Sequence, residues 1–316
     1  MPPVAYDTAA YGDVLDAKYD GPGRRLATSS ADCVVRIWNA EKGSLIRELK
    51  RHRANVMTLS WATGRFNGTL ASGSNDGQVA IWREVRPDEW QMVHEVNVTG
   101  SANVVGWCPS DYGLILAIAG GDEVGVVTMV SRREGAGAGA AGDQWQVRSF
   151  VAHPGGVASM SWGPSTSPAT LATGPAVGRA AALAPCRLVT CGVDGEVCVW
   201  HTDDKQESWN KQHTLSADGF TGAPRDVAWR PNVGLPSSMV AACTSDGSVA
   251  IWVQDMDGQP WRLRTCWRVD GDARRLVWSK AGMLLTVSIG DSGLAMYREG
   301  CGGSWTFVSD FAELDG

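Results

Sequence analysis

The stretch Asp76 to Trp82, DGQVAIW, decides how this chain is organised. Aspartate followed by glycine suits a tight turn, because glycine accepts positive φ and the carboxylate accepts hydrogen bonds from turn amides. The residues after the turn alternate in the manner of a β-strand. The same spacing of aspartate and tryptophan recurs at Asp32 to Trp38, Asp194 to Trp200 and Asp246 to Trp252, with weaker copies at Asp291 to Tyr297 and Asp122 to Thr128.

The six aspartates are mostly 44 to 52 residues apart, which is typical of WD-type β-propeller repeats. Each such repeat is one four-stranded sheet that cannot bury both faces alone. We therefore predict an all-β fold, a six-bladed open WD-repeat β-propeller that forms a single domain over residues 1–316. The predicted blades are 11–50, 51–97, 98–152, 153–216, 217–268 and 269–314.

Tryptophan marks three positions of the repeat, and these account for fourteen of the 15 tryptophans. One is the end of the aspartate signature, one is the end of the first strand, and one precedes the outer strand. Aromatic side chains placed identically in successive blades indicate packing within and between sheets rather than a binding site.

Every repeat, including the last, has its own outer strand. The expected outer strands are 45–49, 91–96, 146–151, 211–215, 262–267 and 306–311. Because the last blade is already complete, no strand is left to fasten it to the first, and two apolar blade faces must pack together or accept a segment of another chain. The segment Val4 to Thr8 lies outside the six sets. We expect its removal to weaken partner capture more than it weakens the fold.

The composition argues for protein partners. A net charge of -6 and a pI near 5.4 give no general attraction to nucleic acid or to an anionic membrane. The eight cysteines lack paired spacing, which indicates reduced thiols in a cytosolic or nuclear protein. No signal peptide is expected at the N-terminus, and no apolar run approaches the roughly 20 residues of a membrane helix.

Three patterns resemble sites for chemistry, and each is better explained by the fold. The glycines of 137–142 match GxGxxG but precede a strand instead of a helix. Cys186, Cys191, Cys198 and His201 match no zinc spacing. The repeated aspartates occur once per blade and do not converge on one substrate. We therefore expect no catalytic residue, no metal and no cofactor, and we read 134–143 and 165–185 as surface loops.

Three longer stretches, 111–122 (DYGLILAIAGGD), 225–236 (RDVAWRPNVGLP) and 244–252 (TSDGSVAIW), resemble the Sec-thirteen family from about Val14 to Phe311. That family is the small propeller subunit of the COPII outer coat and of the nuclear pore Y complex. The resemblance implies an open ring that receives a seventh blade from an α-solenoid partner, either a coat subunit of the Sec-thirty-one type or a solenoid nucleoporin, in a stable hetero-oligomer.

The resemblance also implies where the protein acts. It would be cytoplasmic, peripheral at ER exit sites and COPII vesicles, and at the nuclear pore complex, serving ER–Golgi and nucleocytoplasmic transport, with indirect membrane contact. The predicted partner-binding residues are Val4, Tyr6, Val14, Tyr19, Leu26, Ile37, Leu276, Leu284, Val287, Leu294 and Met296. The predicted structural repeat positions are Asp32, Trp38, Asp76, Trp82, Asp194, Trp200, Asp246, Trp252 and Asp291.

Other functions stay open. A closed WD-repeat module that reads peptides would need top-face side chains converging on its axis, and the Seh-type nuclear pore propeller shares the open architecture. A propeller enzyme would need a converging catalytic set. Departures from the family pattern include Arg51 before His52 and the missing histidine of repeats one, five and six.

Overall fold

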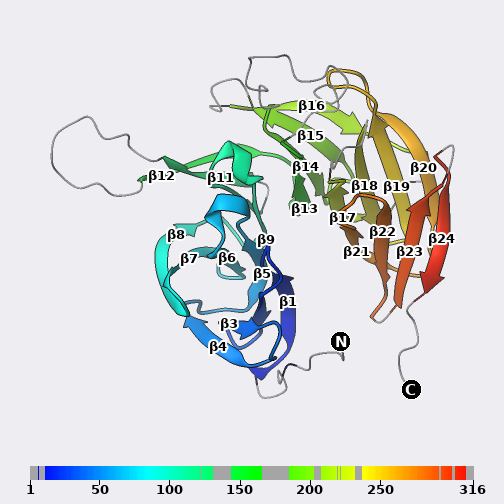
Figure 1. Ribbon diagram of the computed structural model, residues 1–316. Coiled ribbons are helices and arrows are strands. Elements are labelled where there is room, and N and C mark those ends of the chain that lie inside the picture. Colours follow the sequence, from blue (N-terminus) through cyan, green and yellow to red (C-terminus); the bar gives the residue numbers. More distant parts are fainter. Residues whose placement is uncertain are drawn as a thin grey trace, which may run out of the picture. The chain divides into compact units, whose positions relative to one another are not determined.

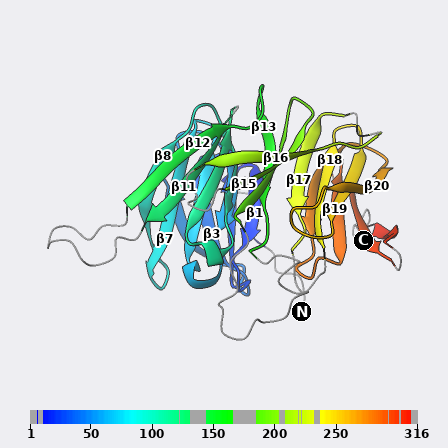
Figure 2. The same cartoon turned by 90° about the horizontal axis from the view of Figure 1, so that it is seen from above.

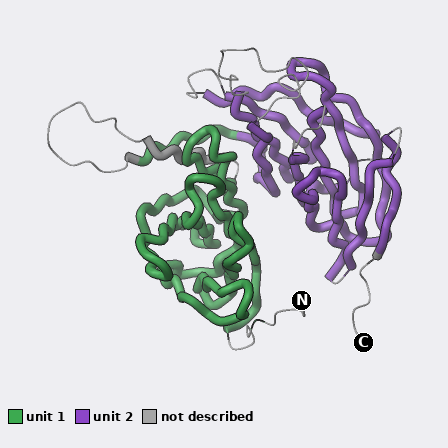
Figure 3. The backbone as a smooth tube through the Cα atoms, in the orientation of Figure 1, with its two compact units in different colours: residues 1–151 green, residues 152–316 purple. Residues whose placement is uncertain are grey.

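The computed structural model describes residues 6, 11–121, 123–130, 144–165, 185–202, 208–218, 220, 222–231, 237–291, 293–300 and 303–310. Contacts divide the chain into two compact units, 1–151 and 152–316 (Figure 3). Within the described residues, the regular elements are β-strands except for the short 3-10 turns Gly64–Phe66 (η2) and Ser110–Tyr112 (η3) and a 3-10 position at Tyr11. No helix in these ranges is long and apolar enough to cross a membrane.

The first unit contains three four-stranded antiparallel sheets, each built from four strands consecutive in the chain (Figure 1). We call them the first, second and third sheets. Their strands are β1 (Val14–Tyr19), β2 (Arg25–Ser30), β3 (Val34–Asn39), β4 (Leu45–Lys50), β5 (Val56–Trp61), β6 (Thr69–Ser74), β7 (Gln78–Arg86), β8 (Glu89–Asn97), β9 (Ala102–Trp107), β10 (Ile115–Gly120), β11 (Glu123–Val130) and β12 (Gln144–Val151).

The second unit repeats this arrangement in the fourth, fifth and sixth sheets. The strands β17 to β20 of the fifth sheet lie side by side in both views (Figures 1 and 2). The strands of this unit are β13 (Val157–Trp162), β14 (Arg187–Gly192), β15 (Val197–Thr202), β16 (Trp209–Leu215), β17 (Pro224–Trp229), β18 (Ser238–Thr244), β19 (Ser248–Gln254), β20 (Arg262–Arg268), β21 (Ala273–Trp278), β22 (Leu284–Ile289), β23 (Gly293–Glu299) and β24 (Trp305–Asp310).

Each of the six sheets therefore has a fourth strand of its own, including the last, where β24 pairs with β23. The four strands of each sheet lie within one of the six ranges expected for the blades. The glycine-rich segment 134–143 and residues 166–184 of the predicted insertion lie outside the described residues, as does Asp122.

The strand register is irregular at the same places in successive repeats. Between the first and second strands, the shift follows the first residue of the first strand in all six sheets, for example between Val56 and Thr58. Between the third and fourth strands of five sheets, it falls at the residue before the aromatic position, for example between Ile81 and Trp82. Such bulges increase local twist, and their repetition shows that the six sheets share one geometry.

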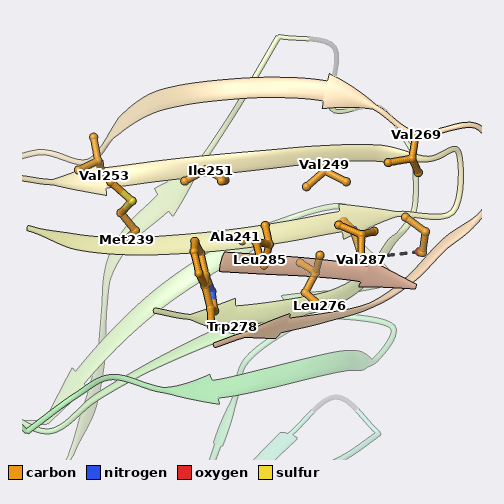
Figure 4. Close-up of a cluster of buried hydrophobic side chains, with 12 residues drawn as sticks. Met239, Ala241, Val249, Ile251, Val253, Val269, Leu276, Trp278, Leu285 and Val287 are labelled. Carbon is orange, nitrogen blue, oxygen red and sulfur yellow. Dashed lines mark hydrogen bonds between the residues drawn. The ribbon is translucent and has the colours of Figure 1, made fainter. Parts of the chain in front are cut away.

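Apolar side chains fill the space between neighbouring sheets inside each unit. In the first unit, one cluster joins the first and second sheets and another joins the second and third. In the second unit, clusters join the fourth to the fifth sheet and the fifth to the sixth. Figure 4 shows Leu285 and Val287 of β22 lying against the fifth-sheet side chains Ala241, Val249 and Ile251. Burial of these faces against each other stabilises the stacking of the sheets.

The aspartates of the repeat stabilise the turn between the second and third strands. Each accepts a hydrogen bond from the backbone amide two residues later, at 3.1 Å for Asp32, 3.0 Å for Asp76, 3.0 Å for Asp194 and 3.1 Å for Asp246. This is the bond by which an aspartate holds its own turn. Asp291 differs, since its carboxylate is 92% exposed and accepts from Arg274 instead.

The tryptophans of the aspartate signature bond within the sheets. The Trp38, Trp82 and Trp200 indoles donate to a Ser or Thr hydroxyl of the second strand, at 2.8, 2.9 and 2.8 Å. Trp252 donates to the Ser216 carbonyl instead. The other two tryptophan series meet edge to face in four repeats, at centroid distances of 5.5 to 5.8 Å. All three series therefore have packing roles.

Candidate partner-binding faces

The sixth sheet has two unlike faces within the described part of the second unit. The residues of β22 alternate between buried and half-buried, whereas every residue of the corresponding strands β6, β10, β14 and β18 is buried. Successive strand residues point to opposite faces of a sheet. One face of β22 therefore packs on the fifth sheet, and the other, which we call the outward face of the sixth sheet, has no cover among the described residues of the second unit.

Apolar side chains dominate this outward face. Residues paired directly across an antiparallel sheet lie on the same side. Thr286 of β22 pairs with Val277 on one neighbouring strand and with Met296 on the other, and Ser288 pairs with Leu294. Val277 is 61% exposed and Leu294 is 39% exposed, while Leu284 and Met296 are half-buried. An exposed apolar row of this kind is a candidate site for contact with another polypeptide.

Arginines border the apolar row. Arg275 pairs with Ser288, and Arg298 pairs with Leu284, so both belong to the outward face of the sixth sheet, and both are exposed. A long charged side chain at the edge of an apolar surface keeps its charged end in water while its methylene groups pack on the neighbouring apolar side chains. The face is thus apolar at its centre and basic at two places on its border.

The predicted partner-binding residues of the sixth sheet divide between its two faces. Leu284, Leu294 and Met296 lie on the outward face. Leu276 and Val287 belong to the cluster between the fifth and sixth sheets and are 5% and 0% exposed. These two side chains are core residues, since the fifth sheet already covers the side of the strand from which they project.

The first sheet differs from the sixth sheet because side chains on both of its faces are buried. Ala27, Val35 and Ile37 pack against the second sheet, so the predicted residue Ile37 is also part of the core. The outward face of the first sheet, turned away from the second, carries the alternate residues, among them Leu26 and Trp38, which pair across β2 and β3. Although these project away from the second sheet, Leu26 and Trp38 are only 7% and 2% exposed.

Two tyrosines that precede β1 cover this face. The ring of Tyr6 meets Trp38 at 6.0 Å and 78°, and that of Tyr11 meets it at 6.2 Å and 64°. The Tyr6 hydroxyl donates to the carbonyl oxygen of Ala40 at 3.2 Å and lies 3.4 Å from the hydroxyl of Tyr19. Burial, and then the Tyr19 hydroxyl, raise the pKa of Tyr6 to about 12.

The remaining predicted residues of the first sheet lie at its margin. Val14 and Tyr19, the two ends of β1, pair with Ser30 and Leu26 and are exposed at 42% and 57%. Val4 lies outside the described residues. Sequence reasoning missed Val277 and Tyr11. The signal for Val277 is its alternation with Leu276 and Trp278 in β21, and that for Tyr11 is an aromatic residue three positions before the first strand.

The groups considered for chemistry have structural surroundings. The described residues hold no cluster of three or more His, Cys, Asp or Glu suited to a metal ion. Cys186, Cys191 and Cys198 are buried, and burial raises the pKa of Cys198 to about 11. His52 and His153 bond the hydroxyls of Ser72 and Thr190, each at 2.7 Å, and these hydroxyls in turn accept from the repeat tryptophans.

Comparison with known proteins gives the family. A model of the WD domain, G-beta repeat, matches residues 6–39 and 43–83. The chain is 34% identical to Protein transport protein SEC13 of Cryptococcus neoformans over 346 residues, with 98% of each chain covered. The chain belongs to the Sec13 family. Sec13 of Emericella nidulans is 33% identical with 95% of each chain covered, and the Sec13 homolog of Drosophila melanogaster is 33% identical with 96% of this chain and 82% of that protein covered.

The structural comparison agrees on the fold. A chain of the crystal structure of the Mitotic Checkpoint Complex matches 90% of this Sec13-family chain and 74% of its own length, with a TM-score of 0.65 and 18% identity. The relatives confirm the predicted family. The six four-stranded sheets and the match to the WD-repeat model confirm an all-β WD-repeat fold.

Proposed function

We propose that this Sec13-family chain is a non-enzymatic scaffold subunit, an open six-bladed propeller completed by a seventh blade that an α-solenoid partner donates. It serves the COPII coat cage, the nuclear pore Y complex or both, and reaches membranes only through its partners. The relatives' names as protein transport proteins support this role. So does the family resemblance of the sequence.

The observation that carries the proposal is the outward face of the sixth sheet. Its apolar row of Val277, Leu284, Leu294 and Met296 stays partly exposed, although β24 already completes the sheet. A β-segment that lies across this row would bury it, at roughly 25 cal/mol of stabilisation per Å² of apolar surface. Since a segment of that kind carries several side chains into contact, the complex is expected to be long-lived.

A charge placed on the face tests the proposal. Val277→Glu puts a carboxylate where docking would remove water, and burying an unpaired charge is strongly unfavourable. Co-expressed with the α-solenoid partner, this variant should bind about tenfold to a hundredfold more weakly than the unaltered chain, as measured by co-purification and titration. The variant should fold, because the Val277 side chain already faces water.

The matched control is Val193→Glu, since Val193 is 64% exposed in a turn of the fourth sheet. It should bind the partner as the unaltered chain does. Equal binding by the Val277 and Val193 variants would remove the sixth sheet from the interface. The proposal also places the protein in the cytoplasm, at ER exit sites and at nuclear pores, which a tagged copy expressed at native level would show.

A further inference from the structure

Two described side chains of the first unit cover the outward face of the first sheet, whereas no described residue of the second unit covers that of the sixth sheet. Tyr6 and Tyr11 precede β1 and lie over Trp38, which is 2% exposed. The two tyrosines are themselves half-buried. We call this pair of side chains the tyrosine cap.

Arg36 gives the tyrosine cap a fixed support. Its guanidinium lies 3.9 Å from the centre of the Tyr11 ring, a close cation–π contact. It also bonds the carboxylates of Asp32 and Glu48, and its side chain is 5% exposed. These partners hold the guanidinium in place, so it presents a flat, charged surface to the ring of Tyr11.

Among the described residues, four ring and polar contacts hold the tyrosine cap. They are two edge-to-face ring contacts, one cation–π contact and one hydrogen bond from Tyr6 to a backbone oxygen, with the Tyr19 hydroxyl at 3.4 Å as a weaker neighbour. Neither tyrosine belongs to a strand. The rings can therefore leave Trp38 without breaking a strand pairing of Tyr6 or Tyr11 themselves, whereas a docking β-segment brings both backbone and apolar contacts.

Given the proposed function, on which this step rests, we infer that the tyrosine cap is an autoinhibitory contact: it occupies the outward face of the first sheet in the free chain, and the donated segment displaces it. The apparent affinity for the partner is then the intrinsic affinity multiplied by the fraction of chains in which the tyrosine cap is open. This reverses the sequence-based expectation that trimming the N-terminal segment weakens capture.

Hydroxyl-radical footprinting of the unaltered chain, free and in complex with the α-solenoid partner, tests the displacement. Side-chain oxidation read by mass spectrometry should rise at Tyr6 and Tyr11 on complex formation, while Trp38 stays protected beneath the new segment. Unchanged protection of both tyrosines in the complex would overturn the inference and leave the proposed function intact.

Binding measurements give a second readout. A cap closed in nine chains of ten weakens binding about tenfold, so the full-length Tyr6→Ala/Tyr11→Ala chain should bind the partner about tenfold more tightly. Tyr6→Phe keeps the ring contact with Trp38 and should change affinity much less. Equal or weaker binding by the double variant, with its other tryptophans as protected as before, overturns the inference. Failure of every form, including the unaltered chain, to bind overturns the proposed function and this inference with it.

Discussion

The indole Nε1 of Trp61 donates a hydrogen bond to the backbone carbonyl oxygen of Lys18, at 2.8 Å, and so joins the second sheet to the first. Trp107 makes the same bond to Ser60, and Trp278 makes it to Ala228, both at 3.1 Å. In these three sheets, the tryptophan at the end of the first strand thus reaches back to the first strand of the preceding sheet. The indole nitrogen of Trp229, at the same position of the fifth sheet, has no hydrogen-bond partner among the described residues. The bond adds to the edge-to-face ring contacts that this tryptophan series makes.

Trp61→Phe should lower the free energy of unfolding. The phenyl ring keeps an aromatic contact with Trp90, but the Lys18 carbonyl loses its donor, so we expect a loss of about 1–3 kcal/mol in urea titration. Trp267→Phe is the control, because the Trp267 indole nitrogen has no hydrogen-bond partner in the described part of the chain. Equal losses in the two variants would show that ring volume alone matters.

Cys33→Gly should stabilise the protein. Cys33 has φ of 68° at the turn position where the other repeats have Gly77, Gly195 and Gly247 at 80°, 85° and 86°. A side chain in this left-handed region costs about 1 kcal/mol or more, partly offset by the greater freedom of glycine in the unfolded chain. We expect a gain of about 0.5–1 kcal/mol in thermal or urea unfolding.

Gly195→Ala should destabilise the protein. A Cβ at Gly195 meets no described atom within 4 Å, so only the left-handed backbone conformation is penalised. Gly77→Ala should lose more, because its Cβ would collide with the carbonyl oxygens of Val98 and Gly100. A Cys33→Gly variant less stable than the unaltered chain would show that the thiol contributes contacts that outweigh the strain.

The free energy of unfolding should decrease as the pH is lowered from 6.5 to 4, because of His52. Burial lowers the pKa of this histidine from 6.5 to about 4 in the folded chain. In that window the unfolded state binds more protons than the folded state, so this contribution is present above pH 6.5 and is lost as the pH falls, at no more than about 1.4 kcal/mol per pH unit.

The non-titrating variant His52→Gln should show a shallower decline over the same window, measured by urea midpoints at half-unit steps of pH. His94 and His213 also have lowered pKa values, chiefly through burial, and are present in both proteins, so the difference isolates His52. Parallel curves for the two proteins would mean that His52 stays accessible to protons when folded.

Asp226→Asn should weaken the second unit. The Asp226 carboxylate is 6% exposed and accepts from the Ser159 hydroxyl at 2.6 Å and from the Leu276 amide at 2.8 Å, which links the fourth, fifth and sixth sheets. Asparagine replaces one acceptor oxygen with a donor, which leaves a buried donor unsatisfied and costs about 1–3 kcal/mol.

Asp16→Asn is the matched control in the first unit, where Asp16 accepts from the Leu59 amide at 2.9 Å but is less deeply buried. Water can replace part of the lost bond there, so its loss in chemical denaturation should be smaller. A larger effect at Asp16 than at Asp226 would contradict the role of burial.

The sequence determined the number of sheets, the strands of each sheet and the turn aspartates. These features rest on local chemistry: Asp246 and Gly247 make a turn because one accepts amide bonds and the other adopts positive φ. The fourth strand of the last sheet was predictable for the same reason, since alternation after Trp305 is a property of neighbouring residues. The sequence also supplied the family, through stretches that stay in register with relatives.

Only the tertiary structure decided which strand faces are covered. Strands buried on two sides carry apolar residues at both odd and even positions, so the alternation that identifies a strand does not say which set meets the neighbouring sheet. Ile37 and Leu26 were therefore predicted to lie on one partner-binding face, and so were Val287 and Leu284. The two members of each pair lie on opposite faces of their sheet. The tyrosine cap could not be read locally either, because Tyr6 meets Trp38 through the folded chain, and only folding brings together residues that sequence places 32 positions apart.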